Sequence, residues 1–252
     1  MAVLIGSARI DENGNATGGA AGDQKKGKEV STQNWYLNNK GWRVFRAIDP
    51  IKRKMIAYAM QAACNNNNIG YDQNPNPSLF KVSKKYDYDP AKVTEKCETD
   101  CSKLVRVCCW YAGIHVEYFT TAYEGTALLN TGEFEEMKGD KYTNSSNYLI
   151  AGDILVTKTR GHTVVVLTNG PLANDGSNAF QFVLVTGNNV FVRKSAGKQN
   201  LAIGLAHKGE RYSYLQKDSF VTNPDGSVTK WFCIFYLDMQ GWISSKYAIL
   251  ST

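Results

Sequence analysis

The chain has 252 residues, of which 43% are hydrophobic and 21% charged, and its formal net charge is +6. This composition is typical of a folded globular protein and excludes a disordered tail of like charge; the length allows one or two hydrophobic cores, and we expect two domains. The basic residues are scattered rather than gathered in one stripe, so the charge only weakly favours polyanionic partners such as nucleic acid, anionic lipid or teichoic acid.

Six cysteines are too few for a disulfide scaffold in a chain of this length, so free thiols are expected. Residues 1–6 lack a basic segment followed by a long apolar one, and no apolar run reaches the roughly 20 residues that cross a bilayer. We therefore expect a protein that is made in the cytoplasm without a signal peptide and that does not insert into a membrane.

The predicted elements begin after a stretch rich in Gly, Asn and Lys over residues 1–40, which has neither helical nor strand periodicity and predicts an ordered loop. Asp49 and Pro50 then supply an N-cap and a first-turn proline for a helix that ends before the asparagines at 65–68.

A second helix is predicted over residues 100–113 and a shorter one over 122–129, while β-branched residues predict buried strands over 153–156 and 163–167. Helices followed by strands predict an α+β domain. Its antiparallel sheet would carry a histidine and its long helix a cysteine.

The second half of the chain changes character near residue 180, where short strands alternate with turns. Strands are predicted over 180–185, 190–193, 201–206, 231–236 and 241–243, with an Asn-Pro-Asp-Gly turn at 223–226. Their close spacing predicts a small all-β barrel, and residues 171–178 form the expected hinge. The predicted domains are therefore 1–176 and 180–252.

Cys101 opens the helix over 100–113, and His162 opens a valine-rich strand directly after Gly161. A thiol attacks as the thiolate, and the unpaired amides of a helix N-terminus lower its pKa. An imidazole that reaches the sulfur can take its proton and later protonate a leaving amine. The pair predicts a cysteine hydrolase, whereas His115 and His207 lie in settings that suggest no role.

Cys101 allows two other interpretations. A buried structural cysteine is the commonest fate of a free thiol, but the neighbouring Asp100 and Ser102 make this position more polar than an ordinary core residue. Zinc could be held by Cys97, Cys101, Cys108 and His162, yet structural zinc sites usually pair closely spaced ligands in two clusters. No metal and no cofactor are expected.

Three segments carry a resemblance to a known family. Residues 99–105 (Thr-Asp-Cys-Ser-Lys-Leu-Val), 151–155 (Ala-Gly-Asp-Ile-Leu) and 161–166 (Gly-His-Thr-Val-Val-Val) resemble the NlpC-type cell-wall cysteine peptidases in order and spacing. Further segments are similar to phage endolysins of Firmicutes built on that papain-like domain: 22–24, 35–36 and 69–73. The resemblance covers most of residues 1–170 and implies a papain-like fold.

The rest of the chain is similar to a bacterial SH3-like domain through residues 185–193 and 241–247. In such proteins this module binds the cell wall, so the resemblance implies a catalytic domain followed by a wall-binding barrel.

By the first resemblance Cys101 is the nucleophile and His162 the base, while Tyr71, Asp100 and Ser102 hold the free amino end of a stem peptide. A carboxylate, a hydroxyl and a phenol can all orient an ammonium group. Asp100 could instead cap the helix, and Tyr71 could simply pack.

The family also places a polar third residue on the strand after the histidine strand, where it fixes the imidazole tautomer. Gln181 is one candidate here, and Asp23 is another if the N-terminal loop folds over the site. The backbone amide of Cys101 would contribute to the oxyanion hole.

The sequence thus predicts an endolysin-like peptidoglycan hydrolase that cleaves an amide bond of the stem peptide without a cofactor. Its partner is bacterial peptidoglycan rather than nucleic acid, and it acts at the wall after release through a phage holin. The alternatives are an N-acetylmuramoyl-L-alanine amidase that uses the same pair, or a non-catalytic wall-binding or phage structural protein. The bond, the host and the oligomeric state stay open.

Overall fold

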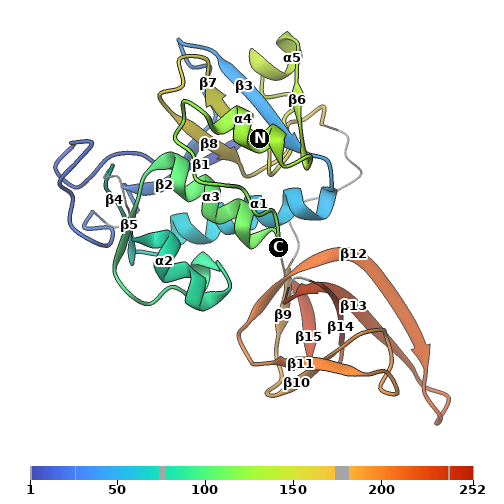
Figure 1. Cartoon of the computed structure of the whole chain (residues 1–252). Helices are drawn as coiled ribbons and strands as arrows, with labels where there is room; N and C mark the ends of the chain where they lie inside the picture. Colours follow the sequence, from blue (N-terminus) through green and yellow to red (C-terminus); the bar gives the residue numbers. More distant parts are fainter. Residues whose placement is uncertain (1, 26, 74–77, 174–181, 238, 252) are drawn as a thin grey trace. The chain divides into compact units, whose positions relative to one another are not determined.

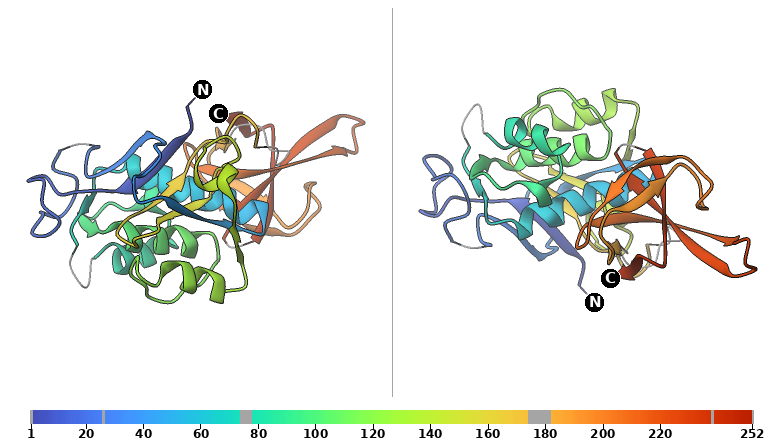
Figure 2. Two further views of the ribbon diagram at one scale, coloured as in Figure 1. Left: turned by 90° about the horizontal axis from the view of Figure 1, so that it is seen from above. Right: turned by 90° about the horizontal axis from the view of Figure 1, so that it is seen from below.

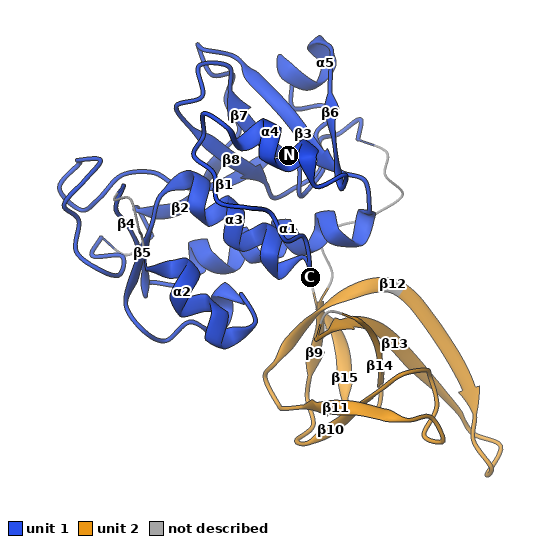
Figure 3. Ribbon diagram, in the orientation of Figure 1, with its two compact units in different colours: residues 1–175 blue, residues 176–252 orange. Residues whose placement is uncertain are grey.

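The computed structural model describes residues 2–25, 27–73, 78–173, 182–237 and 239–251 (Figure 1). The chain divides into two compact units, residues 1–175 and 176–252 (Figure 3). The division falls within residues 174–181, which lie outside the described part of the chain, as do the ends of the two predicted domains.

Unit 1 is built on a six-stranded sheet with the order β2-β1-β8-β7-β3-β6, in which each neighbouring pair is antiparallel. Its strands are β1 Leu4–Ala8, β2 Val30–Asn34, β3 Trp42–Ala47, β6 Phe134–Met137, β7 Ile154–Thr157 and β8 Thr163–Val166. A separate parallel pair joins β4 Ile69–Tyr71 to β5 Cys97–Thr99.

The helices of unit 1 are α1 Pro50–Asn65, α2 Leu79–Ser83, α3 Cys101–Tyr111, α4 Glu124–Asn130 and α5 Asp140–Thr143, with short 3-10 helices at Lys84–Tyr86 and Pro90–Lys92. Helices α1 and α3 pack against each other, and both contact the sheet (Figures 1 and 2). Among the described residues, no helix is long and apolar enough to cross a membrane.

Glycine is needed where α1 crosses β1. A Cβ atom added to Gly6 would lie 2.7 Å from Met60 Cγ and 3.1 Å from Cys64 Sγ. Because glycine has no Cβ atom, helix α1 can approach strand β1 closely at this position.

The opposite face of the sheet has a core of its own. Its buried residues are Val3, Ile5, Trp42, Val44, Leu149, Leu155, Val164 and Val166. Successive strand residues point to opposite faces, so Thr163 and Val165 of β8 face the helices.

Two expectations for unit 1 were wrong. Residues 1–40 are not only loop, because they contain β1 and β2, and β1 is paired on both sides. The helices also do not precede the strands, since β1, β2 and β3 come before α1. Strand β1 is buried at four consecutive positions and so lacks the polar alternation by which a half-buried strand is found in a sequence.

Unit 2 contains seven antiparallel strands in the order β11-β10-β14-β13-β12-β9-β15. Their bounds are β9 Phe182–Val185, β10 Val190–Arg193, β11 Ala202–Ala206, β12 Arg211–Thr222, β13 Val228–Tyr236, β14 Met239–Ser244 and β15 Ala248–Ser251. The predicted turn at 223–226 joins β12 to β13, and Gly226 has a φ of 79° there.

Strands β12 and β15 were not predicted. Strand β12 is polar along much of its length and changes register between Tyr214 and Asp218, so its sequence shows no steady period of two. The core of unit 2 contains side chains from all seven of these strands, β12 and β15 included; examples are Val183, Val192 and Ile234. An SH3-like relationship stays a prediction.

Candidate active site

The junction between β5 and α3 positions the first group of candidate residues. Asp100 is the N-cap of α3, with φ −99° and ψ 178°, and its side chain accepts a hydrogen bond from the Lys103 backbone N–H at 2.7 Å. Cys101 is the first residue of the helix. Because β4 runs parallel to β5 with Tyr71 opposite Thr99, Tyr71 lies beside the start of α3.

The start of β8 brings the predicted base close to the same place. The Thr163 backbone N–H lies beside the Cys101 sulfur and lowers the pKa of the thiol, against the larger effect of burial. His162 is the preceding residue; its own N–H donates to Thr157 Oγ1 at 3.1 Å, and its carbonyl accepts from the Thr157 N–H at 2.9 Å. The predicted nucleophile thus contacts the residue next to the predicted base, and a direct pairing of sulfur and imidazole stays a prediction.

The protonation states at this site differ from the sequence-based expectation of a lowered thiol pKa. Burial raises the pKa of Cys101 to about 12, and the Asp100 and Glu124 carboxyls add to the rise. Burial lowers the pKa of His162 to about 4, with a further contribution from Arg9. Desolvation therefore outweighs the helix N-terminus, and both groups are neutral at pH 7.

Lys103 was missed in the sequence. Its ammonium Nζ lies 3.0 Å from Asp100 Oδ2 and 3.2 Å from Ser102 Oγ, and it lies 4.8 Å from the centre of the Tyr118 ring. Ser102 Oγ in turn donates to Asp100 Oδ1 at 2.9 Å, and all three of these polar residues are buried. Asp100 and Ser102 therefore already hold an ammonium group of this chain. The only sequence signal was the spacing of three between acid and base.

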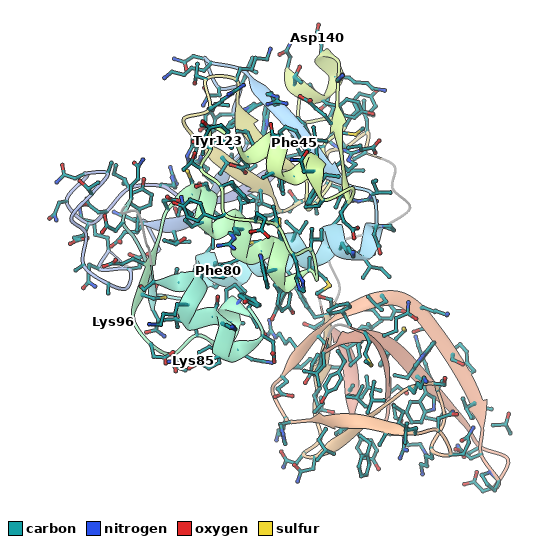
Figure 4. All side chains as sticks on the ribbon, in the orientation of Figure 1. Phe45, Phe80, Lys85, Lys96, Tyr123 and Asp140 are labelled. Carbon is teal, nitrogen blue, oxygen red and sulfur yellow. The ribbon has the colours of Figure 1, made fainter. Side chains whose placement is uncertain are left out.

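Glu124 was missed as well. It is the first residue of α4, directly after Tyr123 (Figure 4), and its side chain is 0% exposed. Thr163 Oγ1 donates to Glu124 Oε1 at 2.7 Å, while Oε2 has no hydrogen-bond partner among the described residues. Burial raises its pKa well above the ordinary value. A glutamate in the first turn of a helix is common on surfaces, so nothing in the sequence indicated this burial.

Tyr71 is buried, and its backbone N–H donates to Glu29 Oε2 at 2.9 Å. Burial raises the pKa of its phenol, and negative charge on Cys101 and Asp100 would raise it further, so the phenol lies near both groups. The structure therefore brings Tyr71, Asp100, Cys101 and Ser102 together.

Neither candidate for a third catalytic residue, Asp23 or Gln181, is shown to contact His162. Asp23 accepts hydrogen bonds from the backbone N–H groups of Lys25, Gly27 and Lys28 at 2.9, 2.6 and 3.1 Å, which shapes the N-terminal loop. Its carboxylate is thus occupied within its own loop. Gln181 lies outside the described residues.

The other histidines and cysteines have structural settings. His115 stacks on Trp110 with ring centres 4.3 Å apart, and His207 is exposed. All six cysteines are buried free thiols. Within the described part of the chain, no group of three or more His, Cys, Asp or Glu side chains is arranged to hold a metal ion.

The Ala-Gly-Asp segment at 151–153 supports the strand that precedes β8. Asp153 forms a two-point ion pair with Arg46, with both N–O distances 2.7 Å, and accepts from the Ile150 N–H at 2.8 Å. Gly152 has a φ of 95° and lies so close to the Arg53 backbone that a Cβ atom would clash. This segment therefore fixes the start of β7.

Comparison with known proteins adds one match. A family model described as an endolysin-like domain matches residues 5–173, which include every candidate residue of this site except Gln181. No curated protein and no solved structure matches the chain. Because the family model covers more than half of the residues, the chain belongs to the endolysin-like domain family.

Proposed function

We propose that this protein is a peptidoglycan hydrolase in which Cys101 attacks an amide bond of the stem peptide and His162 transfers the proton. Membership of an endolysin-like family indicates a phage-type lytic function with peptidoglycan as substrate. This mechanism is supported by the approach of the Thr163 N–H to the Cys101 sulfur at the start of α3, because Thr163 directly follows His162 in the chain.

The proposed reaction begins from a neutral pair. As the Cys101 sulfur attacks the carbonyl carbon, His162 accepts the thiol proton, so ionisation and attack occur together. The C–N bond then breaks, and His162 gives the proton to the departing amine. Water next loses a proton to His162 and attacks the thioester, which releases the carboxylic acid and regenerates the thiol.

Backbone amides at the start of α3 supply the stabilisation of the oxyanion. The first N–H groups of a helix have no partner within it, so the Cys101 N–H is free of the helix's own hydrogen bonds. Such donors stabilise the charge that develops on the carbonyl oxygen during attack. A papain-like arrangement of this kind needs no metal ion.

The proposed roles of Asp100 and Ser102 change in view of Lys103. These residues were expected to hold a free amino end of the substrate, but the Lys103 ammonium already occupies that position. We therefore assign Asp100 and Ser102 to positioning the first turn of α3. Tyr71 remains the proposed substrate contact, since its phenol lies near Cys101.

Unit 2 is proposed to be an SH3-like module that keeps the enzyme on the wall. Two modules on one chain convert the second binding event into an intramolecular one, which raises the local concentration of substrate. An amidase would use the same pair on the bond between sugar and peptide.

The nucleophile is tested by Cys101→Ser, with Cys64→Ser as the matched control, since Cys64 is a buried free thiol on α1. Loss of the thiol is expected to reduce the clearing of purified cell walls by about a thousandfold or more, as for other covalent nucleophiles. The control variant should keep most of the activity.

Mass spectrometry of the muropeptides released by the wild-type protein names the bond and separates endopeptidase from amidase. Clearing by a folded Cys101→Ser variant at the wild-type rate would exclude the assigned nucleophile. Absence of any released muropeptide from the walls of a panel of Gram-positive species would favour a structural protein instead.

A further inference from the structure

Unit 2 contains a pocket of about 330 Å³. It lies between the start of β10, the start of β13 and the end of β14. Its lining residues are Asn188, Asn189, Val190, Phe191, Arg193, Lys198, Trp231, Ser244 and Tyr247. Among these described residues are three aromatic rings, two amides and two cations, but no carboxylate.

The aromatic groups present apolar surface that a monomeric domain does not need. Phe191 is 52% exposed and Tyr247 48% exposed, although both are large side chains beside a well-formed core. The Arg193 guanidinium lies 5.2 Å from the centre of the Phe191 ring, so the cation is held against the aromatic face. Exposed rings next to a fixed cation form a surface suited to a ligand with both apolar and anionic parts.

The charge of unit 2 favours the same type of ligand. Residues 176–252 contain eight Lys or Arg and four Asp or Glu, so this unit carries +4 of the chain's net charge of +6. Asp218 is paired with Lys230 at 2.7 Å, whereas the Asp225 carboxylate lies with Lys198 and Lys246 around one pocket and offsets part of their charge. Arg193 lines no pocket with a described carboxylate, so its positive charge is available to a ligand.

The pocket also has a neighbour. A second pocket of about 400 Å³ is lined by Lys198, Lys246 and Asp225 together with other residues of the β12–β13 turn. Because Lys198 lines both pockets, they adjoin along one surface. Two adjoining pockets fit consecutive units of a polymer better than a single small molecule.

We propose that these pockets form the wall-binding site and that the ligand is the carboxylate-bearing glycopeptide of peptidoglycan. Sugar rings and alanyl methyl groups match the exposed faces of Phe191 and Tyr247, and acetamido and peptide groups match the two asparagine amides. Stem-peptide carboxylates match Arg193 and Lys198 through charge-assisted hydrogen bonds. A polyol phosphate chain matches the cations but has no ring for the aromatic faces. This inference rests on the proposed function.

The test uses the full chain with Cys101→Ser so that walls stay intact during binding. Sacculi from a panel of Gram-positive species are stripped of teichoic acid with hydrofluoric acid, and the bound fraction is measured by sedimentation. Arg193→Gln with Lys198→Gln, and separately Phe191→Ser, are expected to weaken binding by about tenfold or more.

The matched controls are Lys208→Gln and Leu205→Ser, which change exposed residues outside both pockets and should bind within about twofold of the parent. Equal binding by pocket and control variants, or no binding of the parent to any sacculi, overturns the proposal. Binding that disappears when teichoic acid is removed overturns it too, because the ligand is then the phosphate polymer.

Failure of this site is separable from failure of the hydrolase. In the chain with Cys101 intact, the pocket variants should cleave soluble muropeptides at the rate of the parent, since a small substrate needs no anchor. If the parent cleaves muropeptides but its binding to walls does not depend on the pockets, only the proposed wall-binding site is overturned. If binding depends on the pockets but no muropeptide is cleaved, the wall-binding site is supported and the proposed hydrolase activity is overturned.

Discussion

Glu124 places a buried carboxyl group, with one oxygen that no described residue bonds, beside the residues that hold the Cys101 sulfur. The Asp100 carboxyl raises the pKa of Glu124 in addition to burial, and the Lys103 ammonium offsets only part of this rise. A neutral carboxyl therefore fits this position better than a carboxylate.

If Glu124 acts as a neutral group, Glu124→Gln should retain activity within a few-fold, because the amide keeps an acceptor for Thr163 Oγ1 and adds no charge. Glu124→Ala leaves the Thr163 hydroxyl unpaired and should lower kcat by about ten- to a hundredfold, equivalent to about 1–3 kcal/mol. Turnover of a soluble muropeptide and Tm are measured for both variants. An equal loss in Gln and Ala, with unchanged Tm, would show that a charged carboxylate is required.

The lowered pKa of His162 predicts a pH dependence of stability. Its pKa falls from 6.5 in the unfolded chain to about 4 in the folded one, so the unfolded state binds more protons between these values. The stabilising contribution is therefore fully present above pH 6.5 and is lost as the pH falls toward 4. Its slope is at most about 1.4 kcal/mol per pH unit.

Guanidinium unfolding at pH 7.5, 6 and 5 measures this slope, and His162→Gln should flatten the part that comes from His162. A slope that is identical in wild type and His162→Gln would mean that other groups, such as buried carboxyls, account for all of the pH dependence.

At the scale of elements, the ion pair between Arg46 of β3 and Asp153 at the start of β7 joins two neighbouring strands of the sheet. Both side chains are almost fully buried, so removing one partner leaves a charge without compensation. Asp153→Asn is expected to lower the free energy of unfolding by about 3–5 kcal/mol.

The matched control is Glu136→Gln, since Glu136 pairs with Arg43 of the same strand β3 but both side chains are partly exposed. Its loss should stay below about 1 kcal/mol. Chemical denaturation measures the free energy of unfolding of both variants. A similar decrease in both would mean that burial does not determine how much these ion pairs stabilise the protein.

The elements also show how far the sequence could be interpreted. Helices α1 and α3 begin where Asp49 and Asp100 predict, because an N-cap is a local signal. Strand β1 was missed because its burial on both faces depends on partners more than 20 residues away. Glu124 was missed for the same reason, since its hydrogen-bond partner Thr163 lies 39 residues further along the chain. The roles of Cys101 and His162 stay predictions that rest on short motifs in the sequence.

At the scale of the whole molecule, the separation of a catalytic unit from a basic second unit predicts different responses to salt. Screening shortens the reach of exposed charges from about 10 Å at 0.1 M to about 3 Å at 1 M salt. Adding salt should therefore weaken binding to sacculi while cleavage of soluble muropeptides, which depends on buried groups, changes little. Parallel measurements at both salt concentrations compare the two activities.

The pairing of β1 with β8 determines when the sheet of unit 1 can form during translation. Ile5 lies opposite Val166, so the first strand waits for a partner made 161 positions later. A ribosome must therefore complete almost the whole of unit 1 before the sheet can close around the junction of α3 and β8. Chains that terminate before β8 consequently lack the strand that pairs with β1 and that brings Thr163 to the start of α3.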